Sequence, residues 1–269
     1  VHNTLMVVSP SVFYAAFHCH VPVVQTLHNF RMLCPAGSYF RGDRICEECS
    51  EKGLQCSLKY GCYRGSKAQT FVSAAILKIH RMLGTYRKVN FICLTEFNRE
   101  KLSRLNEGGK QIVDMKKVYI KPNFTFQEGI SGEVQKAGDY FLVVGRVEAL
   151  KGIDVVVKAF EKIPDQKLIV AGDGPMMAEM KAYIMDHNMS NVKFAGYLDK
   201  AKVQEKYRGA KAVIMASQCY EAFAMTIAEA YSNAVPVIAG NVGNLANMVE
   251  EGVTGIKFVY DSPDDHKIM

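Results

Sequence analysis

The chain has 269 residues, of which 49% are hydrophobic and 22% charged, and its formal net charge is +6. This composition is ordinary for a globular protein with one large or two medium cores. No run of about 18 apolar residues occurs, so we expect no transmembrane helix. Residue 1 is Val, without a charged leader and cleavage site after it, so we expect no signal peptide and allow that the chain begins inside a longer protein.

The positive charge is concentrated in the first part of the chain. Residues 1–125 hold 18 Lys and Arg against 8 Asp and Glu, whereas the remainder holds 15 against 19. A basic half favours an anionic partner such as a phosphate, a nucleic acid or a membrane surface. A solvated surface without a partner is the alternative.

The first half is expected to alternate helices and strands, but incompletely. In chain order we expect a helix over 9–19, a strand at "VPVVQTL", helices over 66–86 and 96–106 with the strand "NFICLT" between them, and a strand at "VYIKPNF". Residues 29–65 do not fit this rhythm. The polar stretch that follows Phe124 and ends at Gly138 is the best candidate for a boundary between two domains.

Cysteines are dense in the irregular stretch, at positions 34, 46, 49, 56 and 62. The Cys46-Glu-Glu-Cys49 knuckle is the usual half of a structural zinc site. We expect Cys34, Cys46, Cys49 and Cys62 to hold a structural zinc ion, with Cys56 as an alternative ligand. Reduced thiols or disulfides would also account for these cysteines, although disulfides are unexpected in the cytoplasm.

A basic amphipathic helix is expected over 74–88, where Lys78, Arg81, Arg87 and Lys88 interrupt an apolar sequence. Such a helix can lie on an anionic membrane surface, and we predict weak peripheral binding. An ordinary packed helix with basic outer residues is the alternative.

The second half alternates far more regularly, from Asp139 to Ile256. Five apolar runs are expected to be buried strands: "YFLVVG", "KLIVAG", "NVKFAG", "KAVIMA" and "VPVIAG". Segments of helical length lie between them, at 151–163, 175–188, 199–208 and 222–233. This alternation predicts a parallel sheet with helices on both faces, in which ligands bind where the strands end.

Two strand ends carry motifs suited to phosphate. In "VVGRVEALKG" a strand ends at Gly145, and Arg146 and Lys151 follow on one loop, where two cations suit an anionic leaving group. In "VAGDGPM" Gly172 and Gly174 form part of a dinucleotide fingerprint, with Met177 at the third glycine position and Pro175 expected to open the helix. The alternative for the first motif is a solvated loop.

Three ionisable side chains lie near other strand or helix ends. His28 lies just past the strand in "VVQTLHNF", within possible reach of a substrate, although a lone His is more often structural. In "QCYEAFAMTIAEAY" a helix that starts near Phe223 would place Glu221 just before its N-terminus and Glu229 about two turns inside. The alternative is that Glu221 is an ordinary N-terminal helix acid and Glu229 pairs with a Lys.

Together these motifs resemble those of retaining glycosyltransferases of family 4, which use nucleotide sugars and have two facing Rossmann-like domains. The segment Glu221-Ala-Phe-Ala-Met-Thr-Ile-Ala-Glu229 resembles the family's pair of glutamates, and "GRVEALKG" its phosphate loop. "GDGP", "FAGYL" and "PVIAG" follow the family's order and spacing, and "SPSVFYAAFHCHVPVVQTLHNFRMLCP" resembles the later part of its first domain. The resemblance covers nearly the whole chain.

The resemblance implies catalytic roles for Arg146 and Lys151, which would bind the donor diphosphate and stabilise its charge. Glu221 would bind hydroxyls of the donor sugar, and His28 would contact that sugar beside the anomeric carbon. The other implied donor-binding residues are Gly145, Gly172, Gly174 and Pro175 around the nucleotide, Tyr197 and Leu198 beside the base, Ala222, Phe223 and Ala224 through backbone N–H groups, and Glu229 on the ribose.

The resemblance also implies an α/β fold with parallel sheets, in two Rossmann-like domains of which the N-terminal one is incomplete. We expect an acceptor-side domain at 1–124 with the cysteine-rich insertion at 34–62, a linker at 125–138 and a donor-binding domain at 139–269. Family members usually begin with a strand and a glycine-rich loop and end with helices that pack on the first domain. We find neither, and expect a fragment, truncated at both ends and inactive alone.

The implied reaction moves a hexose from a nucleotide-diphosphate donor to a hydroxyl of a glycan or glycolipid, with retention and without a catalytic metal. The acceptor would be a lipid-linked or polysaccharide precursor of the cell envelope. We expect a cytoplasmic protein, peripheral on the inner membrane face, without a nucleic-acid partner. The alternatives are an NAD-dependent oxidoreductase, disfavoured by the missing third glycine, and a zinc-stapled nucleic-acid-binding protein, which leaves Glu221 and Glu229 unexplained.

Overall fold

The computed structural model describes residues 1–2, 4, 9–107, 109–126 and 138–260. The chain divides into two compact units, which are described separately. Unit 1 comprises Val1–Asn123 together with the short segment Tyr220–Phe223, and unit 2 comprises Phe124–Cys219 and Ala224–Met269. Most of the expected linker at 125–138 lies outside the described residues.

Unit 2 is built on a six-stranded sheet with the order β10-β9-β8-β11-β12-β13, in which every neighbouring pair is parallel. Its strands are β8 (Tyr140–Val144), β9 (Lys167–Ala171), β10 (Val192–Gly196), β11 (Ala210–Met215), β12 (Val237–Gly240) and β13 (Gly255–Phe258). The first five are the expected strands. The short edge strand β13 was not predicted from the sequence.

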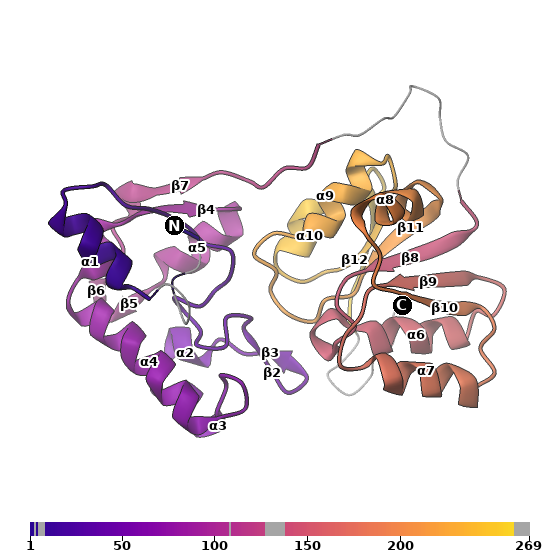
Figure 1. Cartoon of the computed structure of the whole chain (residues 1–269), viewed down its shortest axis with the longest axis horizontal. Coiled ribbons are helices and arrows are strands. Elements are labelled where there is room, and N and C mark those ends of the chain that lie inside the picture. Colours follow the sequence, from indigo (N-terminus) through magenta and orange to yellow (C-terminus); the bar gives the residue numbers. More distant parts are fainter. Residues whose placement is uncertain (3, 5–8, 108, 127–137, 261–269) are drawn as a thin grey trace. The chain divides into compact units, whose positions relative to one another are not determined.

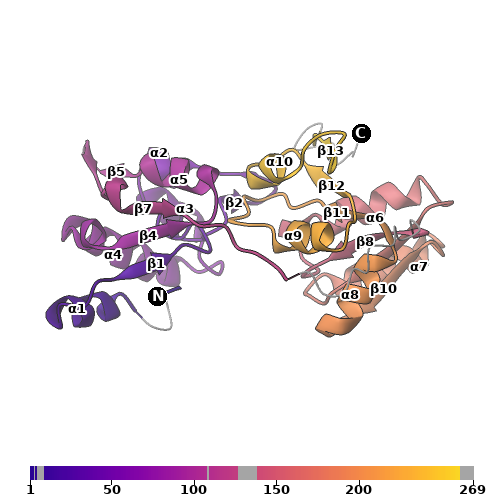
Figure 2. The same ribbon diagram turned by 90° about the horizontal axis from the view of Figure 1, so that it is seen from above.

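Helices cover both faces of this sheet (Figures 1 and 2). They are α6 (Ile153–Glu161) and α7 (Met177–Asp186) on one face, and α8 (Lys200–Arg208), α9 (Met225–Ser232) and α10 (Asn244–Met248) on the other. Adjacent residues of β8 show why both layers are needed: Leu142 belongs to the core under α8 and α9, and Val143 to the core under α6. Since successive side chains of a strand point to opposite faces, the apolar runs require cover on each side.

Unit 1 contains a smaller, three-stranded parallel sheet of order β1-β4-β7. Its strands are β1 (Val24–Thr26), β4 (Asn90–Cys93) and β7 (Val118–Ile120), and its longer helices are α1 (Ser11–His18), α4 (Lys67–Met82) and α5 (Glu96–Ser103). Ser66 and Thr95 start α4 and α5, because each hydroxyl accepts a hydrogen bond from a backbone N–H of the first turn. With parallel sheets in both units, the predicted α/β class is confirmed.

Short elements complete unit 1. The 3₁₀ helices η1 (Thr85–Lys88) and η2 (Met115–Lys117) precede β4 and β7, and β5 (Asn106–Glu107) pairs antiparallel with β6 (Lys110–Gln111). The cysteine-rich stretch forms the hairpin β2 (Phe40–Arg41) and β3 (Arg44–Ile45) and the helices α2 (Glu48–Glu51) and α3 (Gln55–Tyr60). As expected from its lack of rhythm, this stretch adds no strand to the parallel sheet.

Helix α4 differs from the predicted basic helix over 74–88. It ends at Met82, and Gly84 adopts a left-handed conformation with a φ of 65° before η1 begins. Arg81 faces inward: it is buried, and its guanidinium donates to the carbonyl of Met32 at 2.5 Å. Arg81 therefore does not belong to the exposed basic surface. Within the described residues, no helix is both long and apolar enough to cross a membrane.

Candidate functional site

A pocket of about 310 Å³ lies where three strands of unit 2 end. Residues at the ends of β8, β9 and β10 form it, together with one residue of α8: Val144, Gly145, Arg146, Ala171, Gly172, Asp173, Tyr197, Leu198 and Val203. Five of these nine are predicted site residues. Asp173 lies inside the recognised "GDGP" motif but was not assigned, and Val203 gave no sequence signal because an apolar helix residue normally marks a core.

Backbone hydrogen bonds hold the pocket loops against one another beyond the strands. The N–H of Gly145 donates to Ala171 at 3.0 Å, and the N–H of Gly172 donates to Gly196 at 2.8 Å. Gly172 is required by this close approach, because a Cβ there would lie 1.7 Å from the carbonyl oxygen of Gly145. At Gly174 a Cβ would lie 2.3 Å from the carbonyl oxygen of Val147. The two glycines of the incomplete fingerprint therefore serve loop packing.

Pro175 does not open α7 as predicted. The helix begins at Met177, so Pro175 lies in the preceding turn, outside the helix. Met176, and not Pro175, directly precedes the helix, and its N–H donates to the carbonyl of Val147 at 3.1 Å. This contact holds the turn before α7 against the neighbouring loop.

The two predicted phosphate-binding cations lie on one loop after β8. Arg146 lines the pocket with 66% of its side chain exposed, and its Nε lies 3.4 Å from a carboxylate oxygen of Glu148. Lys151 ends the 3₁₀ helix η3 (Ala149–Lys151). The loop packs beside the end of β11, because a Cβ at Gly152 would lie 2.0 Å from the carbonyl oxygen of Ala216.

Glu229 has a protein partner, but it is not the Lys of the alternative interpretation. The phenol of Tyr207, on α8, donates to Glu229 Oε2 at 2.8 Å. Tyr207 is fully buried, and burial and then the Glu229 charge raise the pKa of its phenol above the usual value. Tyr207 therefore stays a neutral donor that fixes the carboxylate of Glu229.

Helix α9 begins at Met225, later than the expected start near Phe223. Glu221 therefore lies four positions before the helix, and Glu229 about one turn inside it instead of two. The reason is that Tyr220–Phe223 packs in unit 1 and leaves the helical path. In that unit Ala222 belongs to the hydrophobic core, and Tyr220 and Phe223 pack against it.

Side chains of unit 1 hold this segment. The amide of Asn98 donates to the carbonyl of Ala222 at 2.7 Å, and the phenol of Tyr220 donates to Glu47 at 2.8 Å. The ring of Tyr220 lies edge-on to that of Phe30, with centroids 6.2 Å apart. No sequence pattern indicated these partners, since Glu47 and Asn98 lie more than a hundred positions away.

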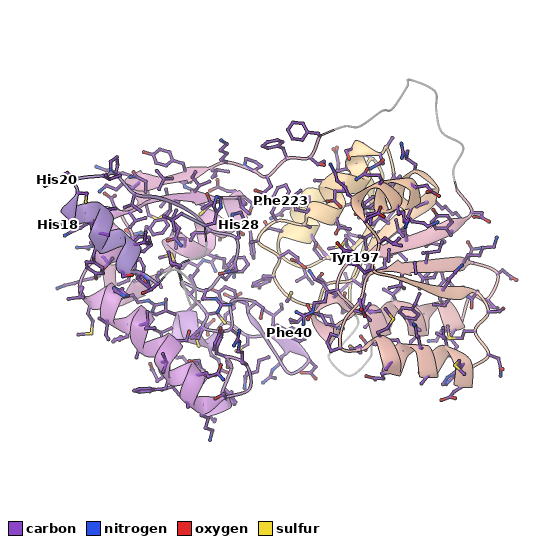
Figure 3. The ribbon with its side chains drawn as sticks, viewed as in Figure 1. His18, His20, His28, Phe40, Tyr197 and Phe223 are labelled. Carbon is purple, nitrogen blue, oxygen red and sulfur yellow. The ribbon has the colours of Figure 1, made fainter. Side chains whose placement is uncertain are left out.

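His28 lies two positions past β1, as predicted, and is half-buried. Its ring stacks on that of His2 with centroids 4.9 Å apart, and Nε2 of His28 lies 2.7 Å from Nδ1 of His2. Burial and then the charge of His2 lower the pKa of His28 below its usual value. The imidazole is therefore biased toward its neutral form. Figure 3 labels His28, Phe223 and the strongly exposed Tyr197, whose exposed fraction is 83%.

The structure does not support the predicted zinc site of Cys34, Cys46, Cys49 and Cys62. Among the residues described, no group of three or more His, Cys, Asp or Glu side chains could hold a metal ion. Burial, followed by the nearby cysteines, raises the pKa of the Cys49 thiol to about 12. The knuckle instead packs Cys49 into the protein at the start of α2.

Comparison with known families decides the assignment. Residues 128–268, which include the whole pocket, match the model of the family described as glycosyl transferases group 1. The chain belongs to this family. Relatives of this glycosyl transferase group 1 protein include an uncharacterized glycosyltransferase, MJ1607, of Methanocaldococcus jannaschii. It is 27% identical over 201 residues, which cover 69% of this chain and 51% of the relative.

Another relative of this group 1 chain is the D-inositol 3-phosphate glycosyltransferase of Xylanimonas cellulosilytica, 32% identical over 43% of this chain and 29% of the relative. Among solved structures, Anabaena HepE in complex with UDP and glucose superposes with a TM-score of 0.65 at 17% identity. That match covers 94% of this chain and 62% of HepE, and shows a shared fold. The chain spans about half, or less, of the curated relatives it matches.

Proposed function

We propose that this chain is part of an enzyme that transfers a sugar from a nucleoside-diphosphate donor to an acceptor hydroxyl. The observation that carries the proposal is the pocket at the ends of β8, β9 and β10, which lies inside the family match and has Arg146 at its edge. Ligands of open parallel sheets bind at this edge. HepE, which shares the fold, was crystallised with UDP and glucose.

In this proposal Arg146 and Lys151 bind the diphosphate and neutralise the charge that develops as it leaves. A guanidinium can hold two phosphate oxygens at once, while an ammonium adds a point charge. Both side chains follow β8 on one loop held by backbone contacts, so they need little reorganisation during the reaction. Protein cations in these positions would make a divalent metal unnecessary for catalysis.

The remaining unit 2 residues recognise the nucleotide. Gly145, Gly172, Gly174 and Pro175 shape the pocket around the phosphates, and the exposed ring of Tyr197, with Leu198 beside it, is available to cover the base. Glu229 accepts hydrogen bonds from the ribose hydroxyls. Its bond from Tyr207 supports this role, since it leaves the carboxylate fixed in one orientation.

The residues of unit 1 act on the donor sugar. Glu221 accepts hydrogen bonds from sugar hydroxyls, aided by backbone N–H groups of Ala222 and Phe223, and of Ala224, which already belongs to unit 2. His28 contacts the sugar beside the anomeric carbon, and its lowered pKa favours a neutral imidazole that does not repel the positive charge developing on the sugar. The Phe30–Tyr220 ring contact supports this grouping, since it joins the two segments within one unit.

The stereochemistry we propose is retention. The acceptor hydroxyl attacks the face that the leaving group vacates, and an oxygen of the departing phosphate takes its proton. No side chain is required as a general base in this path, and catalysis comes from positioning and charge stabilisation. The transferred sugar is a hexose, and the acceptor is a lipid-linked or polysaccharide precursor of the cell envelope.

An exposed apolar stripe at α4 supports the peripheral membrane site that we propose. We expect that site to face the cytoplasmic side of the membrane. Phe71, Ile79 and Met82 on α4 and Leu83 directly after it are 61%, 52%, 73% and 64% exposed, and point away from the buried residues of the helix. Lys67 precedes the stripe at the start of α4, and the exposed Arg87 and Lys88 follow in η1, so the surface combines apolar and basic groups. Such a surface suits anionic lipids.

The test is product analysis with the complete gene product. The enzyme is offered a mixed pool of nucleotide sugars with lipid-linked and soluble glycan acceptors, and products are identified by mass spectrometry. The anomeric configuration follows from NMR. We expect one nucleoside diphosphate to be released per sugar transferred, with retention. Hydride transfer to NAD, or binding of oligonucleotides without any nucleotide sugar, would contradict the proposal.

A further inference from the structure

We propose that Glu47 and Lys101 position the segment that carries Glu221, and thereby the sugar-binding carboxylate of the donor site. This inference rests on the proposed function, because it gives the cysteine-rich insertion a task within the same site. Neither residue is expected to touch the substrate, so both are positioning residues and not catalytic ones.

Lys101 is an unusual residue to bury. It lies on α5, only 7% of it is exposed, and its ammonium is 2.5 Å from a carboxylate oxygen of Glu47. The ammonium also lies 4.8 Å from the ring centroid of Tyr220 and 5.2 Å from that of Phe97. A buried lysine is costly unless it is paired, so the pair and the rings around it fix one another.

Tyr220 connects this buried charge to the donor segment. Its phenol donates to the same Glu47 oxygen that Lys101 contacts, at 2.8 Å. Its ring lies edge-on to three aromatic rings, with centroid distances of 5.0 Å to Phe97, 5.6 Å to Tyr39 and 6.2 Å to Phe30. Since Tyr220 is the residue before Glu221, fixing its ring and phenol fixes the backbone from which Glu221 projects.

The shifts in pKa agree with a negatively charged Glu47 that accepts hydrogen bonds from Lys101 and Tyr220. Burial by itself raises the pKa of this carboxyl, but hydrogen bonds from Lys101 and Tyr220 outweigh it and hold the pKa below its ordinary value. For Tyr220, burial and then the hydrogen bond to Glu47 raise the pKa of the phenol, which therefore remains a donor. Glu47 directly precedes α2, between Cys46 and Cys49, so the insertion supplies the acceptor.

The cysteine-rich insertion contributes several of the residues that contact Tyr220. Tyr39 and Glu47 both come from the stretch 29–65, which adds no strand to the parallel sheet of unit 1. Tyr39 is fully buried, and its phenol shares a hydrogen bond of 2.6 Å with Ser50 in α2. The insertion therefore supports Tyr220, which it contacts through Tyr39 and Glu47.

Two variants test the proposal. Tyr220→Phe removes one hydrogen bond and leaves the ion pair in place, so it should fold. Glu47→Gln removes the charge and is the stronger change. The matched control is Tyr231→Phe in α9 of unit 2, which removes the hydrogen bonds of another half-buried phenol, to the carbonyl of Met248 at 3.0 Å and to the hydroxyl of Thr254 at 2.9 Å.

The first measurement is cleavage by chymotrypsin after Tyr220 or Phe223 in the full chain. Cleavage after the exposed Phe124 and Phe126, which are 67% and 74% exposed, is the internal reference. We expect the ratio of the two rates to rise about 10-fold in Tyr220→Phe and more in Glu47→Gln, as expected for losing a hydrogen bond to a charged group. Tyr231→Phe should leave the ratio unchanged.

The second measurement compares the affinities for UDP and UDP-glucose by calorimetry. The variants should bind UDP within twofold of the wild type but UDP-glucose about 10-fold more weakly, because only the sugar contact depends on Glu221. An unchanged cleavage ratio would overturn the proposed network. A changed ratio with equal losses for both ligands would overturn the positioning role.

The two measurements also separate this inference from the proposed function. If the wild type bound neither UDP nor UDP-glucose, the choice of a uridine donor would be wrong, whereas the proposed function names a nucleoside-diphosphate donor without its base. The cleavage ratio requires no ligand, and would then decide by itself whether Glu47 and Lys101 hold the segment.

Discussion

The pocket loops of unit 2 and the Tyr220–Phe223 segment of unit 1 are held by different kinds of contact. In the pocket, backbone N–H groups donate to backbone carbonyls, as from Gly172 to Gly196. The segment is held by side chains that are distant in sequence, among them Glu47 and Lys101. Backbone contacts tolerate most substitutions except at glycine, whereas side-chain contacts depend on each partner. Substitutions in the pocket loops and in the Tyr220–Phe223 segment should therefore have different effects.

The largest effect is expected where the backbones touch. Gly172→Ala would place a Cβ 1.7 Å from the carbonyl oxygen of Gly145, at a φ of +154°. Gly145→Ala has a similar φ of +151° but meets no atom within 4 Å, so it isolates backbone strain from the clash. We expect Gly145→Ala to cost about 1–3 kcal/mol of unfolding free energy, and Gly172→Ala distinctly more.

Urea denaturation followed by circular dichroism measures both variants. Equal losses for the two alanines would show that the loops can separate without cost, and that their backbone contact does not hold the pocket together.

Removing a positive charge at the pocket edge is the next test, because it should lower turnover without disturbing the backbone. In the complete enzyme, Arg146→Ala or Lys151→Ala should lower turnover about 10²-fold or more, as loss of a charge-stabilising donor does. Lys181→Ala, from the exposed surface of α7, is the control for a lost positive charge in unit 2. Near-normal turnover in both site variants would remove the phosphate-loop assignment.

The exposed surfaces of the two units can be compared through a pair of methionines. Met82 on α4 and Met185 on α7 are 73% and 75% exposed. If the stripe on α4 docks on lipid, Met82→Ser should weaken co-sedimentation with anionic vesicles about 10-fold, since burial of a methionine contributes about 1.5–3 kcal/mol. Met185→Ser should change nothing. Equal behaviour of the two, or binding that is insensitive to salt, would contradict a membrane site on α4.

The smallest effect concerns pH and the side-chain-held segment. Because Lys101 and Tyr220 hold the pKa of Glu47 below its ordinary value despite burial, Glu47 stabilises the fold above its unfolded-state pKa, about 4.3. That contribution is lost as the pH falls through the folded-state pKa. The difference in unfolding free energy between wild type and Glu47→Gln should therefore shrink by about 1 kcal/mol as the pH falls from 6 to 3. A constant difference would show that Glu47 is not held as a charge.

How far the sequence could be interpreted differed between the two units. In unit 2 the apolar runs predicted five strands, and the motifs predicted one site for Gly145, Gly172 and Tyr197, all of which line the pocket. The predicted helix starts were wrong: α7 begins after Pro175 and α9 after Phe223, and in each case the residues before the helix pack against a distant part of the chain. The local sequence does not indicate which distant loop will pack against a helix start.

In unit 1 the cysteines were the strongest local signal, and they led to a zinc site that the structure does not support. In the sequence, Glu47 and Lys101, to which we assign the positioning role, do not differ from ordinary surface charges. Their role depends on a pairing of α5 with the start of α2, and on a tyrosine 173 positions from Glu47. No spacing rule relates positions so far apart.

The sequence by itself determined the α/β class, the parallel sheet of unit 2 and the strand ends at which the pocket lies, because hydrophobic periodicity and glycine placement are local properties. Only the tertiary structure decided that Tyr220–Phe223 leaves the path of α9 for unit 1, that Tyr207 fixes Glu229, and that Arg81 turns inward. These outcomes follow from contacts between distant segments, where burial makes each polar group find a partner that neighbouring residues do not specify.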